Sequence, residues 1–206
     1  MIQVWGRRNS GNVIKVLWCL REIGHPFDVE EVGGPHGKNK EDWFLALNPN
    51  GLVPVVRDEG GYVVWESNVI VRYLAAKYDP GGMWPEDAIA RADADRWMDW
   101  PMLVQPYMTT LNVGLIRTPS EQRDMSKIEV ARRAAADIWA VLDKHLRDRD
   151  FVAGSQLTIG DIAIGNLAYC WFNLDVEREE MPGLQSWYRR LSERQAFQTE
   201  VMRPLA

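Results

Sequence analysis

The sequence contains little cysteine, little histidine and no excess of basic residues. Only two cysteines, Cys19 and Cys170, occur in 206 residues, and their wide separation argues against a disulfide scaffold and a CxxC redox pair. The three histidines do not show the spacing of metal ligands, so we expect no metal site. With 24 basic and 29 acidic side chains, the chain has no basic stripe, and we expect no nucleic-acid partner.

Long hydrophobic runs are also missing. No apolar segment reaches the roughly 18 residues that are needed to cross a bilayer, and the first residues do not form the apolar segment of a signal peptide. We therefore expect a cytoplasmic protein without a membrane partner. The one overabundant residue type is tryptophan, with ten copies spread over the chain, and we expect most of them to fill the core.

The chain divides into two regions of different pattern. Residues 1–78 alternate short strand and helix patterns in the order βαβ, short helix, ββ, α, which predicts a mixed sheet covered by helices. A cluster of two prolines and two glycines marks a linker over residues 79–85. Residues 86–206 show only helical spacing and predict a helix bundle. Pro101 and Pro106 are expected to bend its first long helix.

Two motifs at a fixed distance are the most specific feature of the sequence. The first is NPNGLVP at residues 48–54, and the second, ESNVIVRYL at residues 66–74, begins twelve residues after the proline that ends the first. The segments FVAG at residues 151–154 and TIGD at residues 158–161 follow in the helical region. Together these motifs resemble those of the cytosolic glutathione transferases, and the resemblance extends over nearly the full chain.

The resemblance implies a fold and a co-substrate. It implies a thioredoxin-like domain over residues 1–78 followed by an all-helical domain over residues 86–206, with glutathione bound mainly by the first. It also implies that the peptide bond between Val53 and Pro54 is cis. Val53 would then offer its backbone amide and carbonyl to the extended glutathione peptide.

Three further positions complete the glutathione site that the resemblance implies. Ser67 is placed as the cap of a helix, where exposed amides attract an anion, and is expected to bind the α-carboxylate of the γ-glutamyl group. Glu66 is expected to receive the ammonium of that group. Lys40 resembles the basic residue that binds the glycine carboxylate, and Lys38 and Asn39 are equally placed alternatives.

The chemistry is expected in the turn at residues 7–13, between the first strand and the first helix. A thiol with a pKa of about 8.5 is only a few per cent ionised near pH 7. One charge-assisted hydrogen bond together with the helix dipole can stabilise its thiolate. No tyrosine precedes Tyr62, so a tyrosine donor is excluded. Ser10 matches the hydroxyl of serine-type transferases, whereas Ser10 and Asn12 together fit a bacterial group with Thr and Asn. We predict Ser10 as the main donor, with Asn12 as its helper or substitute.

The second substrate is expected between the two domains. Candidate wall residues are Tyr107, Met108, Leu111 and Trp171, and their apolar and aromatic character suits a hydrophobic electrophile. Glutathione transfer to such an electrophile is the predicted activity. Glutathione-dependent disulfide reduction or peroxide reduction is an alternative, and a non-catalytic binding or regulatory protein on the same fold is another.

The resemblance further implies a homodimer. In this arrangement the helical domain of one subunit packs on the thioredoxin-like domain of the other. An acidic residue of the partner subunit, Asp93 or Asp95, is then expected to help hold the γ-glutamyl ammonium.

Overall fold

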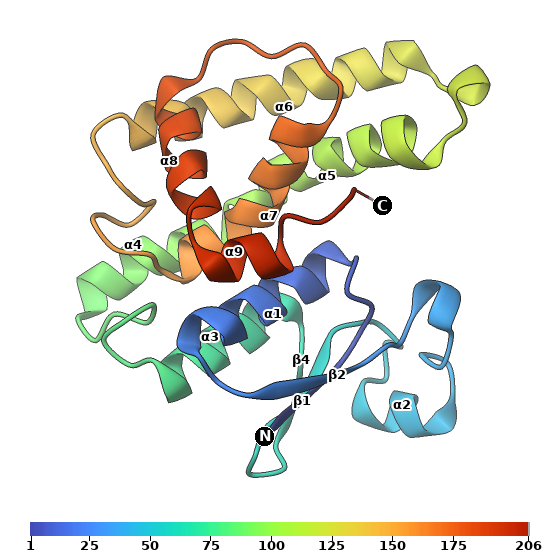
Figure 1. Ribbon diagram of the computed structural model, residues 1–206, viewed down its shortest axis with the longest axis vertical. Coiled ribbons are helices and arrows are strands. Elements are labelled where there is room, and N and C mark those ends of the chain that lie inside the picture. The colour runs from blue at the N-terminus through green and yellow to red at the C-terminus, as the bar shows by residue number, and fades with distance from the viewer. Residues whose placement is uncertain (206) are drawn as a thin grey trace.

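The computed structural model describes residues 1–205 and contains two regions, with the strands and α1–α3 below the remaining helices in the view of Figure 1. The N-terminal region consists of β1 (Ile2–Trp5), α1 (Gly11–Ile23), β2 (Phe27–Glu30), the short 3-10 turn η1 (Gly34–His36), α2 (Asp42–Leu47), β3 (Val55–Arg57), β4 (Val63–Trp65) and α3 (Ser67–Tyr78). The C-terminal region consists of α4 (Ala88–Asp99), α5 (Pro101–Asn112), the π-helical turn η2 (Val113–Arg117), the 3-10 turn η3 (Ser120–Gln122), α6 (Met125–Leu146), α7 (Ile159–Asn173), α8 (Pro182–Ser192) and α9 (Gln195–Glu200).

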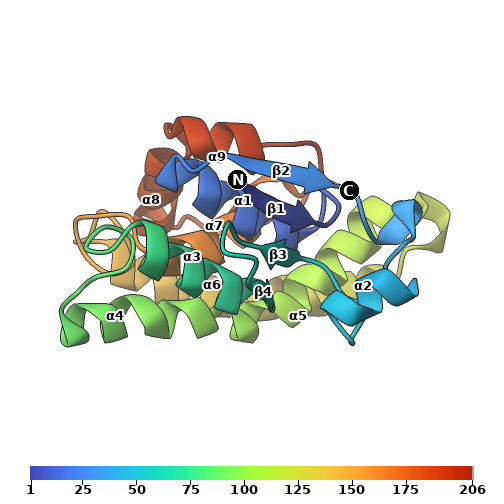
Figure 2. The same ribbon diagram turned by 90° about the horizontal axis from the view of Figure 1, so that it is seen from below.

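The strands form the mixed sheet that the sequence predicts. Their order is β2-β1-β3-β4, with β1 parallel to β2 and antiparallel to β3, and β3 antiparallel to β4. Helices α1 and α3 lie between this sheet and the helical region (Figures 1 and 2). Helix α2 packs near the sheet through Phe44, which is buried in a cluster with Trp5, Val32 and Val55. The thioredoxin-like domain followed by an all-helical domain is therefore confirmed.

Helix α1 shows how local signals position the first turn. Its apolar residues recur every three or four positions and are buried: Val13, Val16, Leu17 and Leu20. The helix ends at Gly24, whose φ of 74° suits a residue without a side chain. The N-terminus of this helix is thereby held at the boundary between the two domains.

The first long helical segment differs from its prediction. A single bent helix was expected, but α4 ends at Asp99 and a separate helix, α5, begins at Pro101. Proline lacks an N–H and is favoured at the first position of a helix, where no backbone partner is needed. Pro106 lies inside α5, and its carbonyl accepts a hydrogen bond from Thr110 Oγ1 at 3.1 Å.

Helix α7 begins with a buried capping box. Thr158 and Asp161 bond each other reciprocally. The Asp161 carboxylate also accepts hydrogen bonds from the Val152 amide at 3.0 Å and from Trp187 Nε1 at 2.8 Å. Burial raises the pKa of this carboxyl to about 6, although the hydrogen bonds that it accepts oppose this shift. One side chain thus ties three segments of the helical domain together.

Two ion-pair groups fix the helical domain against α1. Arg194 donates to both carboxylate oxygens of Glu22 at 2.8 and 2.7 Å. Glu200 of α9 is 1% exposed and pairs with Arg21 of α1 at 2.5 Å. Because Arg194 is the N-cap residue of α9, both pairs tie α1 to α9 and its start, which holds α1 in a defined position relative to the C-terminal domain.

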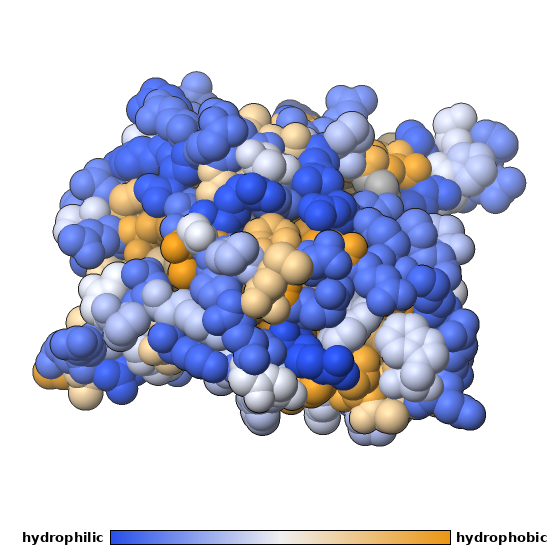
Figure 3. All heavy atoms as spheres, turned by 60° about the horizontal axis from the view of Figure 1, so that its bottom comes forward, coloured by the Kyte–Doolittle hydropathy of each residue, from blue (hydrophilic) through white to orange (hydrophobic). Residues whose placement is uncertain are grey.

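The surface and the helix lengths carry little further information. The face shown in Figure 3 is mostly hydrophilic, with apolar patches separated by polar side chains. Within residues 1–205, no helix is long and apolar enough to cross a membrane. No group of three or more His, Cys, Asp or Glu side chains in this range could hold a metal ion.

Candidate functional site

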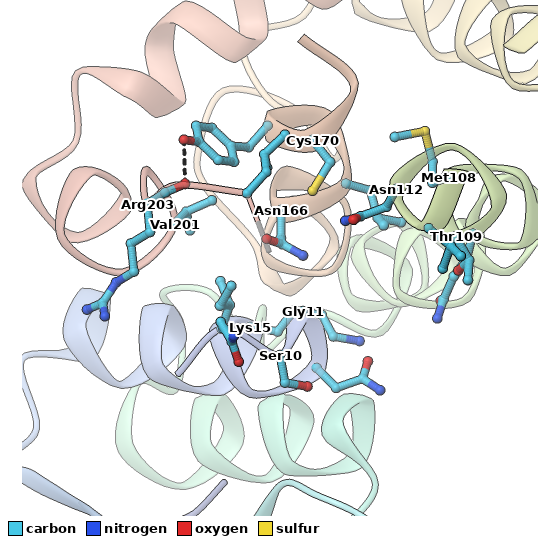
Figure 4. A pocket seen from close by; sticks show the side chains of 18 of the residues that line it. Ser10, Gly11, Lys15, Met108, Thr109, Asn112, Asn166, Cys170, Val201 and Arg203 are labelled. Atoms are coloured by element: carbon cyan, nitrogen blue, oxygen red, sulfur yellow. Dashed lines mark hydrogen bonds between the residues drawn. The ribbon is translucent and has the colours of Figure 1, made fainter. Parts of the chain in front are cut away.

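Ser10 lies at the N-cap of α1, in extended backbone with φ −85° and ψ 124°. An N-cap serine usually accepts a hydrogen bond from an amide of the first helical turn, but Ser10 makes no such bond. The side chain instead lines a cavity of about 210 Å³ (Figure 4). The hydroxyl and the amides of this helix N-terminus are therefore both open to a bound anion.

Asn12, the second predicted thiolate donor, has a different environment. Its side chain is exposed, and its Oδ1 accepts a hydrogen bond from Ser67 Oγ at 3.3 Å. The contact joins the first turn of α1 to the first turn of α3. The structure thus brings Ser10, Asn12 and Ser67 into one region.

The Val53–Pro54 peptide bond is cis, as the resemblance implies. Pro54 is buried, whereas Val53 is partly exposed. Within the described chain, neither the amide nor the carbonyl of Val53 takes part in a backbone hydrogen bond. This backbone is consequently available to an extended peptide.

The strand-to-helix junction at Glu66 corrects one expectation. Ser67 was expected to be the cap of α3, but Glu66 holds the N-cap position and Ser67 is the first residue of the helix. Glu66 has a φ of 71°, which is unusual for a residue with a side chain and strains the backbone. Its carboxylate is exposed beside the helix N-terminus, whereas Ser67 is only 7% exposed.

The three alternatives for the glycine carboxylate now differ in their contacts. Lys38 forms an ion pair with Glu30 at 2.8 Å, and Asn39 Nδ2 donates to the carbonyl of Gly51 at 2.8 Å. Lys40 is exposed, and its Nζ makes only a long contact of 3.5 Å with the carbonyl of Asn50. Of the three, Lys40 has the side chain that is least engaged within the described chain.

The structure places the four predicted acceptor residues in different surroundings. Met108 lines the cavity beside Ser10. Leu111 and Trp171 are fully buried in the core and do not line this cavity, and Tyr107 is 37% exposed outside it. Helical spacing predicts that all four residues face inward, but it does not distinguish a residue of the core from a residue that lines a cavity.

Polar residues that the sequence analysis missed form much of the cavity wall. Helix α5 contributes Gln105, Thr109 and Asn112, which recur at helical spacing, and α7 contributes Asn166. In Figure 4, Thr109 and Asn112 project from one side of the cavity and Asn166 from another. The polar stripe on α5 and the asparagine in the middle of the apolar stretch of α7 were the available signals.

Lys15 is a partly buried cation in the same wall. Its Nζ donates to Asn68 Oδ1 at 2.8 Å, and Asn68 Nδ2 donates to the carbonyl of Met98 at 2.8 Å. Burial lowers the pKa of Lys15 to about 8, while the nearby Glu66 carboxylate raises it and Arg72 lowers it further. Positive charge is thus present near Ser10 at neutral pH.

Known proteins match this chain in sequence and in domain organisation. The family model of the glutathione S-transferase N-terminal domain matches residues 9–77, and that of the C-terminal domain matches residues 103–195. Glutathione S-transferase GstB of Escherichia coli (strain K12) is 41% identical over 100% of both chains. Glutathione S-transferase 3 of Zea mays is 29% identical over 97% of this chain and 93% of its own.

A solved structure extends the likeness to three dimensions. It is that of the theta class glutathione S-transferase from Xanthomonas axonopodis pv. citri with glutathione bound. The two chains are 43% identical, the match covers 100% of this chain and 99% of the other, and the TM-score is 0.94. Both domain models and full-length relatives above 40% identity therefore show that this chain belongs to the glutathione transferase family.

Proposed function

We propose that this glutathione transferase activates its co-substrate through Ser10. The main support for this proposal is that Ser10, at the N-terminus of α1, lines the cavity and makes no capping hydrogen bond. Asn12 already accepts a hydrogen bond from Ser67, which favours a role in holding the γ-glutamyl end. Ser10 is then the primary thiolate donor, and Asn12 its helper.

The remaining residues orient glutathione on the thioredoxin-like domain. Ser67 and the N-terminal amides of α3 take the α-carboxylate, and Glu66 takes the ammonium. The free backbone groups of Val53 pair with the peptide, beside the buried Pro54. Lys40 takes the glycine carboxylate, which leaves the cysteinyl sulfur facing the turn that holds Ser10.

The reaction itself needs no covalent bond to the protein. The sulfur of glutathione loses its proton to solvent, and the Ser10 hydroxyl donates to the thiolate. The thiolate electron pair forms a bond to an electrophilic carbon held in the cavity, and the leaving group departs with the electron pair of its own bond. A panel of carbon electrophiles, disulfides and peroxides distinguishes transfer from the reductase and peroxidase alternatives.

A matched pair of lysine variants tests the glutathione site. Lys40→Met is expected to raise the glutathione Kd about three- to tenfold, because an exposed charge pair contributes roughly 1 kcal/mol. Lys38→Met is expected to leave the Kd within twofold, because Lys38 pairs with Glu30. Titration calorimetry measures both. If the two variants have the same Kd, the assignment of Lys40 to the glycine carboxylate is wrong. If the wild-type protein binds no glutathione at millimolar concentration, neither glutathione transfer nor glutathione-dependent reduction is its activity.

We also propose a homodimer. Large apolar side chains are exposed on β4, α3 and α5, as a subunit contact requires: Trp65, Val69, Met102 and Leu103. Light scattering should give about twice the chain mass of 23.7 kDa. A mass of one chain at micromolar concentration would contradict the dimer.

The acidic residues that were expected to reach the partner subunit are paired within their own chain. Asp95 accepts a hydrogen bond from Arg72 at 2.6 Å, and Asp93 pairs with Arg96 at 3.0 Å. Asp95 shares Arg72 with Asp99, so the negative charge of Asp95 is less fully neutralised than that of Asp93, which pairs with Arg96 alone. Of the two, we retain Asp95 as the candidate that contacts the glutathione of the partner subunit.

A further inference from the structure

Two side-chain amides in the cavity lack partners. Asn166 of α7 is 7% exposed, and none of the hydrogen bonds within residues 1–205 involves its side chain. Asn112 Oδ1 of α5 is buried and also has no partner in this range. Figure 4 shows both side chains at the cavity. Because Asn112 Oδ1 is buried without a hydrogen bond and the Asn166 side chain at the cavity wall has no protein partner in this range, both groups are suited to a polar ligand.

Asn166 lies directly against the catalytic turn. A β-carbon at Gly11 would come within 2.7 Å of Asn166 Nδ2, so the absence of a side chain at Gly11 allows the amide to approach the first turn of α1. Gly11 stands between Ser10 and Asn12 in the sequence. The Asn166 amide therefore lies beside the turn that presents Ser10 to the cavity.

The hydrogen-bonding capacity of the pair defines a chemical class. Asn166 Nδ2 offers a donor, and Asn112 Oδ1 offers an acceptor. An alkyl group in this space would leave both unpaired and would keep water away from them. A group with a carbonyl oxygen and an N–H would satisfy both. Gln105 and Thr109 add further polar groups to this wall, beside the apolar Met108 and Val113.

We propose that Asn112 and Asn166 bind a carboxamide-like group of the acceptor, with the carbonyl oxygen on Asn166 and the N–H on Asn112. The proposal rests on the proposed function of Ser10 and replaces the hydrophobic electrophile that was expected. For a halogenated acetamide, the sulfur forms the new bond to the methylene carbon, and halide leaves with the electron pair of the broken bond. The amide group stays on the two asparagines and orients that carbon toward the sulfur.

Binding of two similar glutathione conjugates tests the proposal. S-(carbamoylmethyl)glutathione carries the amide, and S-propylglutathione has an alkyl chain of similar size. Calorimetry of the wild-type protein is expected to show about five- to tenfold tighter binding of the amide conjugate, the effect of one or two neutral hydrogen bonds. Equal binding, or tighter binding of the propyl conjugate, would overturn the proposal. Failure of both conjugates and of glutathione itself would overturn the proposed function as well.

Variants at the two asparagines localise the effect. We expect each of the variants Asn166→Leu and Asn112→Leu to reduce the preference for the amide conjugate over the propyl conjugate at least threefold. The Kd of unmodified glutathione should stay within twofold of the wild-type value. Asn173→Leu makes the same change on the same helix but at an exposed position outside the cavity, and should retain the preference. Full preference in both cavity variants would overturn the assignment.

The unfolding temperature of Asn166→Leu shows whether a change in conjugate binding comes from a loss of stability. Leucine and asparagine have similar shapes, and Asn166 has no hydrogen bond to lose in the described chain. We expect Asn166→Leu to unfold at the same or a higher temperature than the wild-type protein, because no hydrogen bond within the described chain is lost and a more apolar side chain takes its place. A lower unfolding temperature would show that Asn166 serves packing and would contradict its role as a ligand-binding residue.

Discussion

Replacing Ser10 with alanine is expected to lower kcat/KM for conjugation by roughly 5- to 50-fold at pH 6.5. A hydrogen bond to a charged group contributes about 1.5–3 kcal/mol, and each pKa unit corresponds to about 1.4 kcal/mol. Loss of the Ser10 hydroxyl should therefore raise the pKa of the bound thiol by one to two units. A pH–rate profile from pH 5.5 to 9.5 should show the rising limb displaced upward, with most of the lost activity recovered at the alkaline end.

Two further variants show whether the hydroxyl of Ser10 is responsible. Ser10→Thr keeps the hydroxyl and should keep the rising limb near its original position. Asn12→Ala should mainly raise the glutathione KM, because Asn12 is bonded to Ser67 in the γ-glutamyl part of the site. If Ser10→Ala leaves the profile unchanged and Asn12→Ala abolishes activity, the thiolate donor is Asn12.

Replacing Asp161 with alanine is expected to lower the free energy of unfolding at pH 7 by about 3–5 kcal/mol. The change leaves buried donors of Thr158, Val152 and Trp187 without their acceptor, and removal of a partner from a buried charged network is strongly destabilising. Urea denaturation at 25 °C measures the effect. Asp148→Ala serves as the matched control, because the Asp148 side chain is 76% exposed, and should change the free energy by less than 0.5 kcal/mol.

Asp161 also makes stability depend on pH in a defined direction. Its folded-state pKa of about 6 lies above the ordinary value of 3.8, so the folded protein binds this proton more tightly than the unfolded chain does. The contribution to the free energy of unfolding is therefore complete below pH 3.8 and is lost as the pH rises through about 6. The difference in the free energy of unfolding between the wild-type protein and Asp161→Asn should therefore change with pH in this range. A difference that stays constant between pH 4 and 6.5 would contradict the raised pKa of Asp161.

Features with a local cause could be predicted from the sequence. Gly24 ends α1 because a left-handed residue is needed there, and Thr158 with Asp161 begins α7 because their side chains bond the free amides of that turn. The helix break before Pro101 was misjudged as a bend, because proline tolerates both a kink and a first helical position. Local chemistry could not decide between those two outcomes.

In the site, too, the positions that depend on local sequence could be predicted, and those that depend on the packing of distant segments could not. Val53, Glu66 and Ser67 come from short motifs whose backbone geometry is set within a few residues, and the structure brings their positions to one edge of the first domain. The cavity depends instead on how α5 and α7 approach α1, which arises from packing between distant segments. Trp171 therefore became a core residue and Asn166 a wall residue, although both lie on the inward side of α7.

The most direct test of the central claim is the pKa of the thiol of glutathione bound to the wild-type protein. Thiolate formation can be followed by ultraviolet difference absorbance in a pH titration with the site saturated. Stabilisation by Ser10 predicts a bound pKa near 6.5, about two units below the value of about 8.5 for a free thiol. A bound pKa equal to that of free glutathione would contradict the account.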